Sequence, residues 1–211
     1  MSTDERATEA GWKAFSENRY DEAAALLEKV TLSYPESGLA HFRLAFSYRM
    51  LNRHDEALTH FNLAAQFDPD DAGYCYQIGK EKAARGDFVA ALPHFADSLE
   101  RDSTGVRTYH DAGACTARLG YLELAVLLYT TCGVLLGVAK SIGFRHDVSE
   151  PQYLMSVDTL RRMLGDRYHA VKKDALDRLG LEDVDENNFK VSVKNLNAFA
   201  HELASALRVI K

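Results

Sequence analysis

The sequence has few cysteines, with only three among its 211 residues. Cys75, Cys115 and Cys132 are an odd number and form no Cys-x-x-Cys pair, which argues against a disulfide framework. We expect all three to be buried, reduced thiols on helices. That pattern is typical of proteins in a reducing compartment.

Basic charge is also scarce. Lysine and arginine number 25 against 31 aspartates and glutamates, so the formal net charge is −6. An acidic chain without a basic stripe is not expected to bind nucleic acid. The first ten residues are polar and acidic and lack the apolar core of a signal peptide. We therefore expect a cytoplasmic protein.

Motifs for catalysis and for metal binding are missing. There is no Gly-x-x-x-x-Gly-Lys-Ser/Thr phosphate loop, no Gly-x-Gly-x-x-Gly and no His-Glu-x-x-His. His201 and Glu202 begin the last of these, but Ser205 stands at the second histidine position. The segment 183–187 resembles the start of a calcium loop, but Lys194 replaces the required bidentate glutamate. The sequence therefore predicts no enzyme, no metal and no cofactor.

A fixed period of 34 residues is the strongest feature that is present. A small alanine recurs at this interval: Ala23, Ala57, Ala91 and Ala125. Four positions after each alanine comes a bulky side chain: Leu27, Phe61, Phe95 and Tyr129. Five positions before each comes a turn former: Asn18, Asn52, Gly86 and Gly120. Such a period indicates a repeat solenoid rather than a single globular core.

Two further positions follow the same register. A small residue, which lets two helices touch, lies twelve positions before each alanine: Gly11, Ala45, Gly79 and Gly113. Pro35 and Pro69 close the first two units. In these positions the chain resembles the tetratricopeptide repeat, in which each unit is a pair of antiparallel helices.

The resemblance covers residues 4–137 and implies a right-handed, all-α solenoid. Its four helix pairs are expected at 4–37, 38–71, 72–105 and 106–137, followed by a helical segment over 138–211 that caps the repeats or serves as an accessory element. The tryptophan usual at the fourth position of the family's pattern is absent from all four units. Pro93 falls inside the predicted second helix of the third unit, where we expect a bend or a late helix start.

One apolar run, Leu122–Ala139, is long enough to resemble a membrane span. It keeps the repeat register, and Glu123 interrupts it. We therefore expect the second helix of the last unit, buried by the segment that follows, and no membrane association.

After the repeats, helical spacing of apolar residues predicts further helices. Residues 143–150 are expected to form a loop, and Ser149 and Pro151 mark the start of the next helix. An acidic loop over 182–188 precedes a last helix, whose apolar face contains Val193, Leu196, Phe199, Leu203, Leu207 and Ile210. These helices could cap the solenoid, form a second binding element, or pair with a second copy to give a homodimer.

The resemblance also implies a binding surface, because the first helix of each family repeat lines a concave groove. Carrying those positions over gives these principal candidates: Trp12, Phe15, Phe42, Phe46, Arg49, Met50, Tyr76, Lys80, Arg107, His110 and Arg118. Aromatic rings gather in the first half, and positive charge faces only one acid, Glu5. Aromatic and arginine side chains often carry binding energy, so we expect a protein or peptide ligand with apolar anchors and acidic residues.

Several interpretations stay open at this stage. The leading one is a non-enzymatic adaptor that binds a peptide or a helix in this groove. One alternative is a chaperone of the bacterial secretion type that holds a client protein, and another is a regulatory repeat arm on a small functional domain. The aromatic residues could instead pack between neighbouring first helices, or the last helix could cover them.

Overall fold

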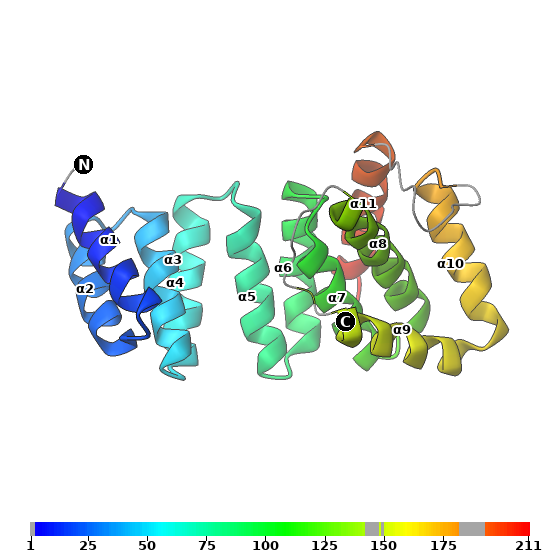
Figure 1. Cartoon of the computed structure of the whole chain (residues 1–211), viewed down its shortest axis with the longest axis horizontal. Helices are drawn as coiled ribbons and strands as arrows, with labels where there is room; N and C mark the ends of the chain where they lie inside the picture. Colours follow the sequence, from blue (N-terminus) through cyan, green and yellow to red (C-terminus); the bar gives the residue numbers. More distant parts are fainter. Residues whose placement is uncertain (1–2, 142–147, 149, 182–192) are drawn as a thin grey trace. The chain divides into compact units, whose positions relative to one another are not determined.

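The computed structural model describes residues 3–141, 148, 150–181 and 193–211 (Figure 1). Within these ranges the chain forms eleven helices and no strand, so the predicted all-α solenoid fold is confirmed. Two compact units divide the chain, Met1–Glu81 and Lys82–Lys211. The helix start at Ser149, the calcium-like segment 183–187 and nearly all of the two expected loops lie outside the described residues, as does the side chain of Glu5.

The first unit consists of helices that follow one another through short turns. They are α1 (Thr3–Ser16), α2 (Tyr20–Ser33), α3 (Gly38–Met50), α4 (His54–Phe67) and most of α5 (Ala72–Ala84). Helix α1 packs on α2, α2 on α3, and α3 on α4. Ile78 of α5 joins the apolar core that Leu44 and Phe61 form between α3 and α4.

The turn between the first and second helix of each repeat contains one residue with a left-handed backbone. These residues are Asn18 (φ 61°), Asn52 (φ 60°), Gly86 (φ 86°) and Gly120 (φ 86°). Glycine adopts this conformation freely, and asparagine does so at lower cost than most residues. The recurring turn formers in the sequence are therefore the residues at which the chain reverses direction.

The repeated alanines and bulky residues form the interior of the helix pairs. All four alanines of the 34-residue period are 0% exposed. A β-carbon on Gly11 would lie 2.6 Å from Cγ of Leu27, and one on Gly113 would lie 2.9 Å from Cε2 of Tyr129. Both distances are shorter than van der Waals contact, so these glycines set how closely the two helices of a repeat approach.

The second unit contains the remaining helices. They are α6 (Phe88–Arg101), α7 (Val106–Arg118), α8 (Leu122–Ser141), α9 (Glu150–Leu164), α10 (Asp166–Arg178) and α11 (Val193–Arg208). Helix α8 packs on α7, α9 and α10, and α9 also contacts α7. Residues of α9 and α10, among them Leu160 and Tyr168, pack against Ala125 and Tyr129 of α8.

Pro93 does not delay the start of its helix. Helix α6 begins at Phe88, at the same repeat position at which α2 begins at Tyr20 and α4 at His54. The proline lies inside the helix and removes the backbone donor for the carbonyl of Val89. The late start offered as one alternative for this helix is therefore wrong.

Helix α8 is apolar enough over Leu122–Ala139 to cross a membrane by length and composition. In the structure, 61% of this window is buried by other parts of the chain. A core helix passes the same test, and packing against α7, α9 and α10 accounts for the apolar composition. The three cysteines are free and buried, as expected.

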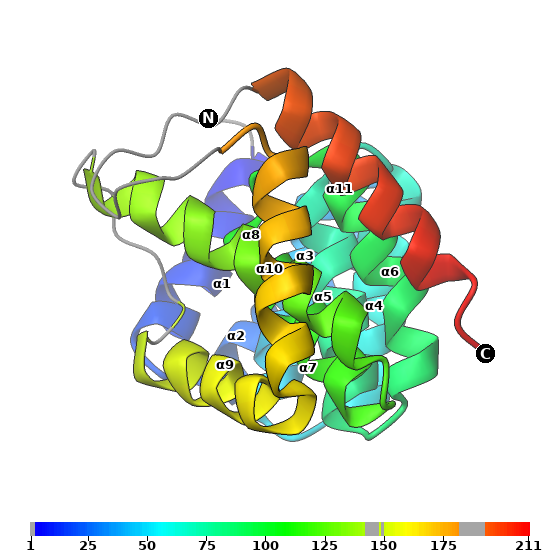
Figure 2. The ribbon, with the colours of Figure 1, turned by 90° about the vertical axis from the view of Figure 1, so that its right-hand side faces the viewer.

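Helix α11 lies along α6 (Figure 2). Its apolar face is covered there, since Leu203, Leu207 and Ile210 are at most 9% exposed. These residues of the stripe therefore pack within the chain, and pairing of the chain with a second copy stays a prediction. Helix α6 is the second helix of its repeat, so within the second unit α11 packs against a second helix.

Candidate functional site

In the first unit, aromatic rings connect the first helices α1 and α3. Trp12 and Phe15 stack with ring centroids 4.7 Å apart, and Phe15 meets Phe46 of α3 at 6.3 Å. Phe42 and Phe46 contact each other edge-on at 4.8 Å. We call this group the aromatic cluster; the structure brings these four predicted residues together.

The aromatic cluster is partly structural. Phe46 lies 5.4 Å from the buried ring of Phe61, and both Phe42 and Phe46 pack against the core of α3 and α4. These two rings therefore contribute to the core of the second helix pair. Met50, at the end of α3, is by contrast 46% exposed.

Arg49 does not offer an unpaired positive charge. Its Nη1 donates to Oε1 of Gln77 at 2.7 Å and lies 3.5 Å from Oε1 of Glu81, which is 2% exposed. The guanidinium also lies 4.2 Å from the ring centroid of Phe46. Burial lowers the pKa of Arg49, and Glu81 opposes that shift. The expectation that Glu5 is the only acid near these cations is thus wrong.

The other predicted residues of the first unit differ in exposure. Tyr76 is buried, whereas Lys80 is exposed, with its Nζ 5.9 Å from the Tyr76 ring. Arg43, absent from the principal candidates, places its guanidinium 5.1 Å above the ring of Trp12. The exposed part of this face therefore combines Met50 and Lys80 with the half-buried edge of the aromatic cluster.

In the second unit the predicted residues lie on α7. Arg107 is exposed, and Nδ1 of His110 lies 2.9 Å from Oδ1 of Asp111. The His110 ring meets Tyr129 edge-on at 5.6 Å, and its Nε2 is buried without a hydrogen-bond partner in the described residues. Arg118 is exposed, with its guanidinium 5.3 Å from the ring of Phe88.

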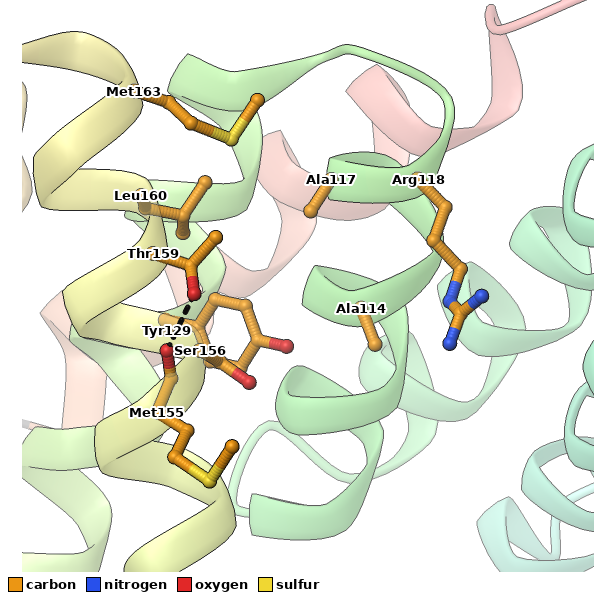
Figure 3. Close-up of a pocket in the computed structure, with 9 residues that line it drawn as sticks. All are labelled: Ala114, Ala117, Arg118, Tyr129, Met155, Ser156, Thr159, Leu160 and Met163. Atoms are coloured by element: carbon orange, nitrogen blue, oxygen red, sulfur yellow. Dashed lines mark hydrogen bonds between the residues drawn. The ribbon is translucent and has the colours of Figure 1, made fainter.

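A pocket of about 400 Å³ opens between α7 and α9, and we call it the α7–α9 pocket (Figure 3). It is lined by Ala114, Ala117, Arg118, Tyr129, Met155, Ser156, Thr159, Leu160 and Met163. Figure 3 shows the α9 side chains facing the two alanines of α7, with Arg118 on the far side. Of the principal candidates only Arg118 lines this pocket, together with Ala114 and Ala117, which the family's groove positions also predict.

The contribution of α9 was missed by sequence reasoning. Met155 and Met163 are 71% and 60% exposed, which is unusual for long apolar side chains on a packed helix. Met155, Thr159 and Met163 are spaced by four residues and therefore share one helix face. That spacing was available in the sequence, but the family pattern assigns no groove position beyond residue 137.

Comparisons with known proteins agree with this architecture. The tetratricopeptide repeat family model matches residues 8–72. No curated protein sequence is significantly similar to the chain. The crystal structure of MamA resembles it at 13% identity with a TM-score of 0.66, over 87% of this chain and 97% of MamA.

A second solved structure is YrrB, described as a TPR protein with an unusual peptide-binding site. It is 17% identical with a TM-score of 0.56, over 81% of this chain and 90% of YrrB. At such identities the likeness shows the fold alone. The family model shows tetratricopeptide repeats over residues 8–72, and the solved structures show that the rest of the chain shares the fold of such repeats.

Proposed function

We propose that the chain is a non-enzymatic interaction scaffold that binds a peptide or a helix carrying apolar anchors and acidic side chains. Proteins of this fold bind protein or peptide partners. The observation that carries the finer proposal is the α7–α9 pocket, which is lined by exposed apolar side chains and by a cation. It offers both halves of the expected ligand chemistry in one place.

The apolar half of the pocket comes from α9 and α8. Methionine side chains are flexible and polarizable, so Met155 and Met163 can adapt to apolar groups of different shape. Tyr129 adds an aromatic surface between them. Burial raises the pKa of Tyr129 to about 12, so its hydroxyl stays protonated at neutral pH and can donate a hydrogen bond.

The charged half is Arg118. It makes no ion pair with any residue in the described ranges. Its guanidinium lies 5.3 Å from the ring centroid of Phe88, a cation–π contact. Arginine binds carboxylates through two parallel N–H groups. A ligand that places an apolar side chain on the methionines can therefore present a neighbouring aspartate or glutamate to Arg118. In the first unit, Met50 offers an exposed apolar side chain and Lys80 an exposed positive charge.

Selection from a random peptide library against the whole chain tests this proposal. We expect selected peptides to combine apolar residues with aspartate or glutamate, and to lose at least tenfold in affinity for Arg118→Glu and for Met155→Asp. Arg162→Glu is the matched control, because Arg162 is exposed on α9 and does not line the pocket. Selected peptides without acidic residues, or equal binding to all variants, would contradict the proposal.

The three free, buried cysteines support a further part of this proposal, namely that the protein works in a reducing compartment such as the cytoplasm. Location of a fluorescently tagged full-length chain in its native cell tests this point, and an extracytoplasmic signal would contradict it.

A further inference from the structure

A second pocket, of about 420 Å³, lies on the other side of α9, between α8, α9 and α10. On α9 it is lined by Leu154, Val157 and Arg161. These residues recur at three and four positions and so form a helix face opposite to the methionines of the first pocket. We call this second cavity the α8–α10 pocket. It is separate from the α7–α9 pocket, to which we assign peptide binding.

The interior of the α8–α10 pocket is mostly apolar. Val134, Leu154, Val157 and Leu176 contribute aliphatic surface from all three helices. Gly133 provides the room for Tyr153, since a β-carbon at Gly133 would collide with the tyrosine hydroxyl oxygen. Burial raises the pKa of Tyr153 above its ordinary value, so this hydroxyl is a neutral donor.

Two cations line the same pocket, and no acid among the described residues does. The guanidinium of Arg161 lies 5.5 Å from the ring of Tyr168, and Lys172 follows on the next turn of α10. Carboxylates close to them in sequence are paired elsewhere: Asp158 with Arg162 at 2.8 Å and Asp174 with Arg178 at 2.9 Å. Neither Arg161 nor Lys172 forms an ion pair within the part of the chain that the structure describes.

We infer that the α8–α10 pocket binds a small anionic amphiphile, namely an unbranched aliphatic chain that ends in a carboxylate. The aliphatic walls match the chain, and Arg161 and Lys172 match the carboxylate. A volume of about 420 Å³ lies within the range of pockets that hold a single small molecule, about 300–1,000 Å³. Charge-assisted hydrogen bonds from Arg161 and Lys172 to the carboxylate would fix the orientation of such a ligand in the apolar cavity.

Calorimetric titration of the full chain with decanoate, below its micelle concentration, tests this inference. We expect one molecule bound per chain. Arg161→Gln combined with Lys172→Gln should weaken binding by about tenfold or more, since both charged contacts are lost. The matched control is Arg162→Gln with Lys173→Gln, the adjacent cations, which do not line the pocket; it should bind as wild type does.

Two further experiments test the apolar part and the charged part of the pocket separately. Val157→Phe fills the cavity and should abolish binding, with circular dichroism and the melting temperature showing that the variant is folded. Decanol, which lacks the charge, should bind at least tenfold more weakly than decanoate. Absence of decanoate binding, equal affinity for decanol, or full affinity in the Arg161→Gln/Lys172→Gln variant would overturn the inference. Arg118→Glu should leave decanoate binding unchanged, so this result is independent of peptide binding.

Discussion

The Nδ1 atoms of His41 and His60 lie 2.8 Å apart, and their rings stack with centroids 5.1 Å apart. Nε2 of His41 lies 2.9 Å from the carbonyl oxygen of Pro35, which can only accept, so Nε2 carries a proton. In a neutral His41 the Nδ1 atom is then the acceptor, and His60 donates to it. The His41–His60 hydrogen bond connects α3 to α4, and the His41–Pro35 hydrogen bond connects α3 to the end of the first repeat.

The histidine pair predicts a loss of stability in mild acid. Burial, followed by the nearby His41, lowers the pKa of His60 to about 4. The unfolded chain binds a proton near pH 6.5, so the contribution of His60 is fully present above that pH and is lost as the pH falls towards 4. The shift corresponds to at most about 3 kcal/mol.

Denaturant unfolding of wild type and His60→Gln between pH 7.5 and 4 measures this effect. Glutamine can still donate to His41 but does not titrate, so the variant should lose less stability across the window. His94, whose pKa burial also lowers, is present in both proteins and cancels in the difference. Equal pH slopes for the two proteins would show that His60 is not the titrating group.

Gly113→Ala should destabilise the second unit by about 1–3 kcal/mol, because the new methyl group overlaps the Tyr129 ring. Thermal unfolding measures the change. In a Tyr129→Leu background the smaller side chain leaves room, so the same glycine substitution should cost less. An equal cost in both backgrounds would mean that the contact with Tyr129 does not set the helix spacing.

Asn52→Val should cost about 1–2 kcal/mol, since a β-branched residue is strained at a φ of 60°. Asn52→Gly should be neutral or stabilising at the same position. Asn62→Val, on the exposed side of α4, serves as the control and should cost less. Comparable melting temperatures for Asn52→Val and Asn62→Val would contradict a strained turn.

The parts of the fold that sequence predicts are those that each repeat requires locally. Each repeat needs a turn residue that tolerates a left-handed backbone and a small alanine in its core. Because these residue types recur every 34 positions, the sequence alone predicts both features. Pro93 shows the limit of this reasoning, because the core contacts of Ala91 and Phe95, both 0% exposed, keep α6 in register despite a lost backbone donor.

The candidate sites were less predictable, because they depend on which side chains meet across helices. The family's groove positions correctly predicted that Trp12 and Phe46 lie in one aromatic cluster. They do not include Glu81, which lies on a different face of α5 and pairs with Arg49. An apolar stripe likewise shows that a helix face is buried without showing its partner. For α11 that partner is α6, about one hundred residues earlier in the chain.

Helix α11 packs on α6 through both ion pairs and apolar side chains. We expect the apolar contacts to contribute more to the free energy of unfolding than the ion pairs do. Arg208 bonds to Oδ1 of Asp97 at 2.6 Å and to Oε2 of Glu100 at 2.6 Å. Its side chain is 37% exposed, so solvent screens these pairs and Arg208→Gln should cost only about 1 kcal/mol. Leu203 is 2% exposed, and Leu203→Ala should cost about 2–5 kcal/mol through the cavity it leaves.

Chemical denaturation at low and high salt separates the two contributions. The effect of Arg208→Gln should shrink further in high salt, because exposed ion pairs are screened, whereas that of Leu203→Ala should persist. Amide hydrogen exchange on α11 should rise most in Leu203→Ala if this helix loosens from α6. A larger loss of stability in Arg208→Gln than in Leu203→Ala would show instead that the ion pairs hold α11 in place.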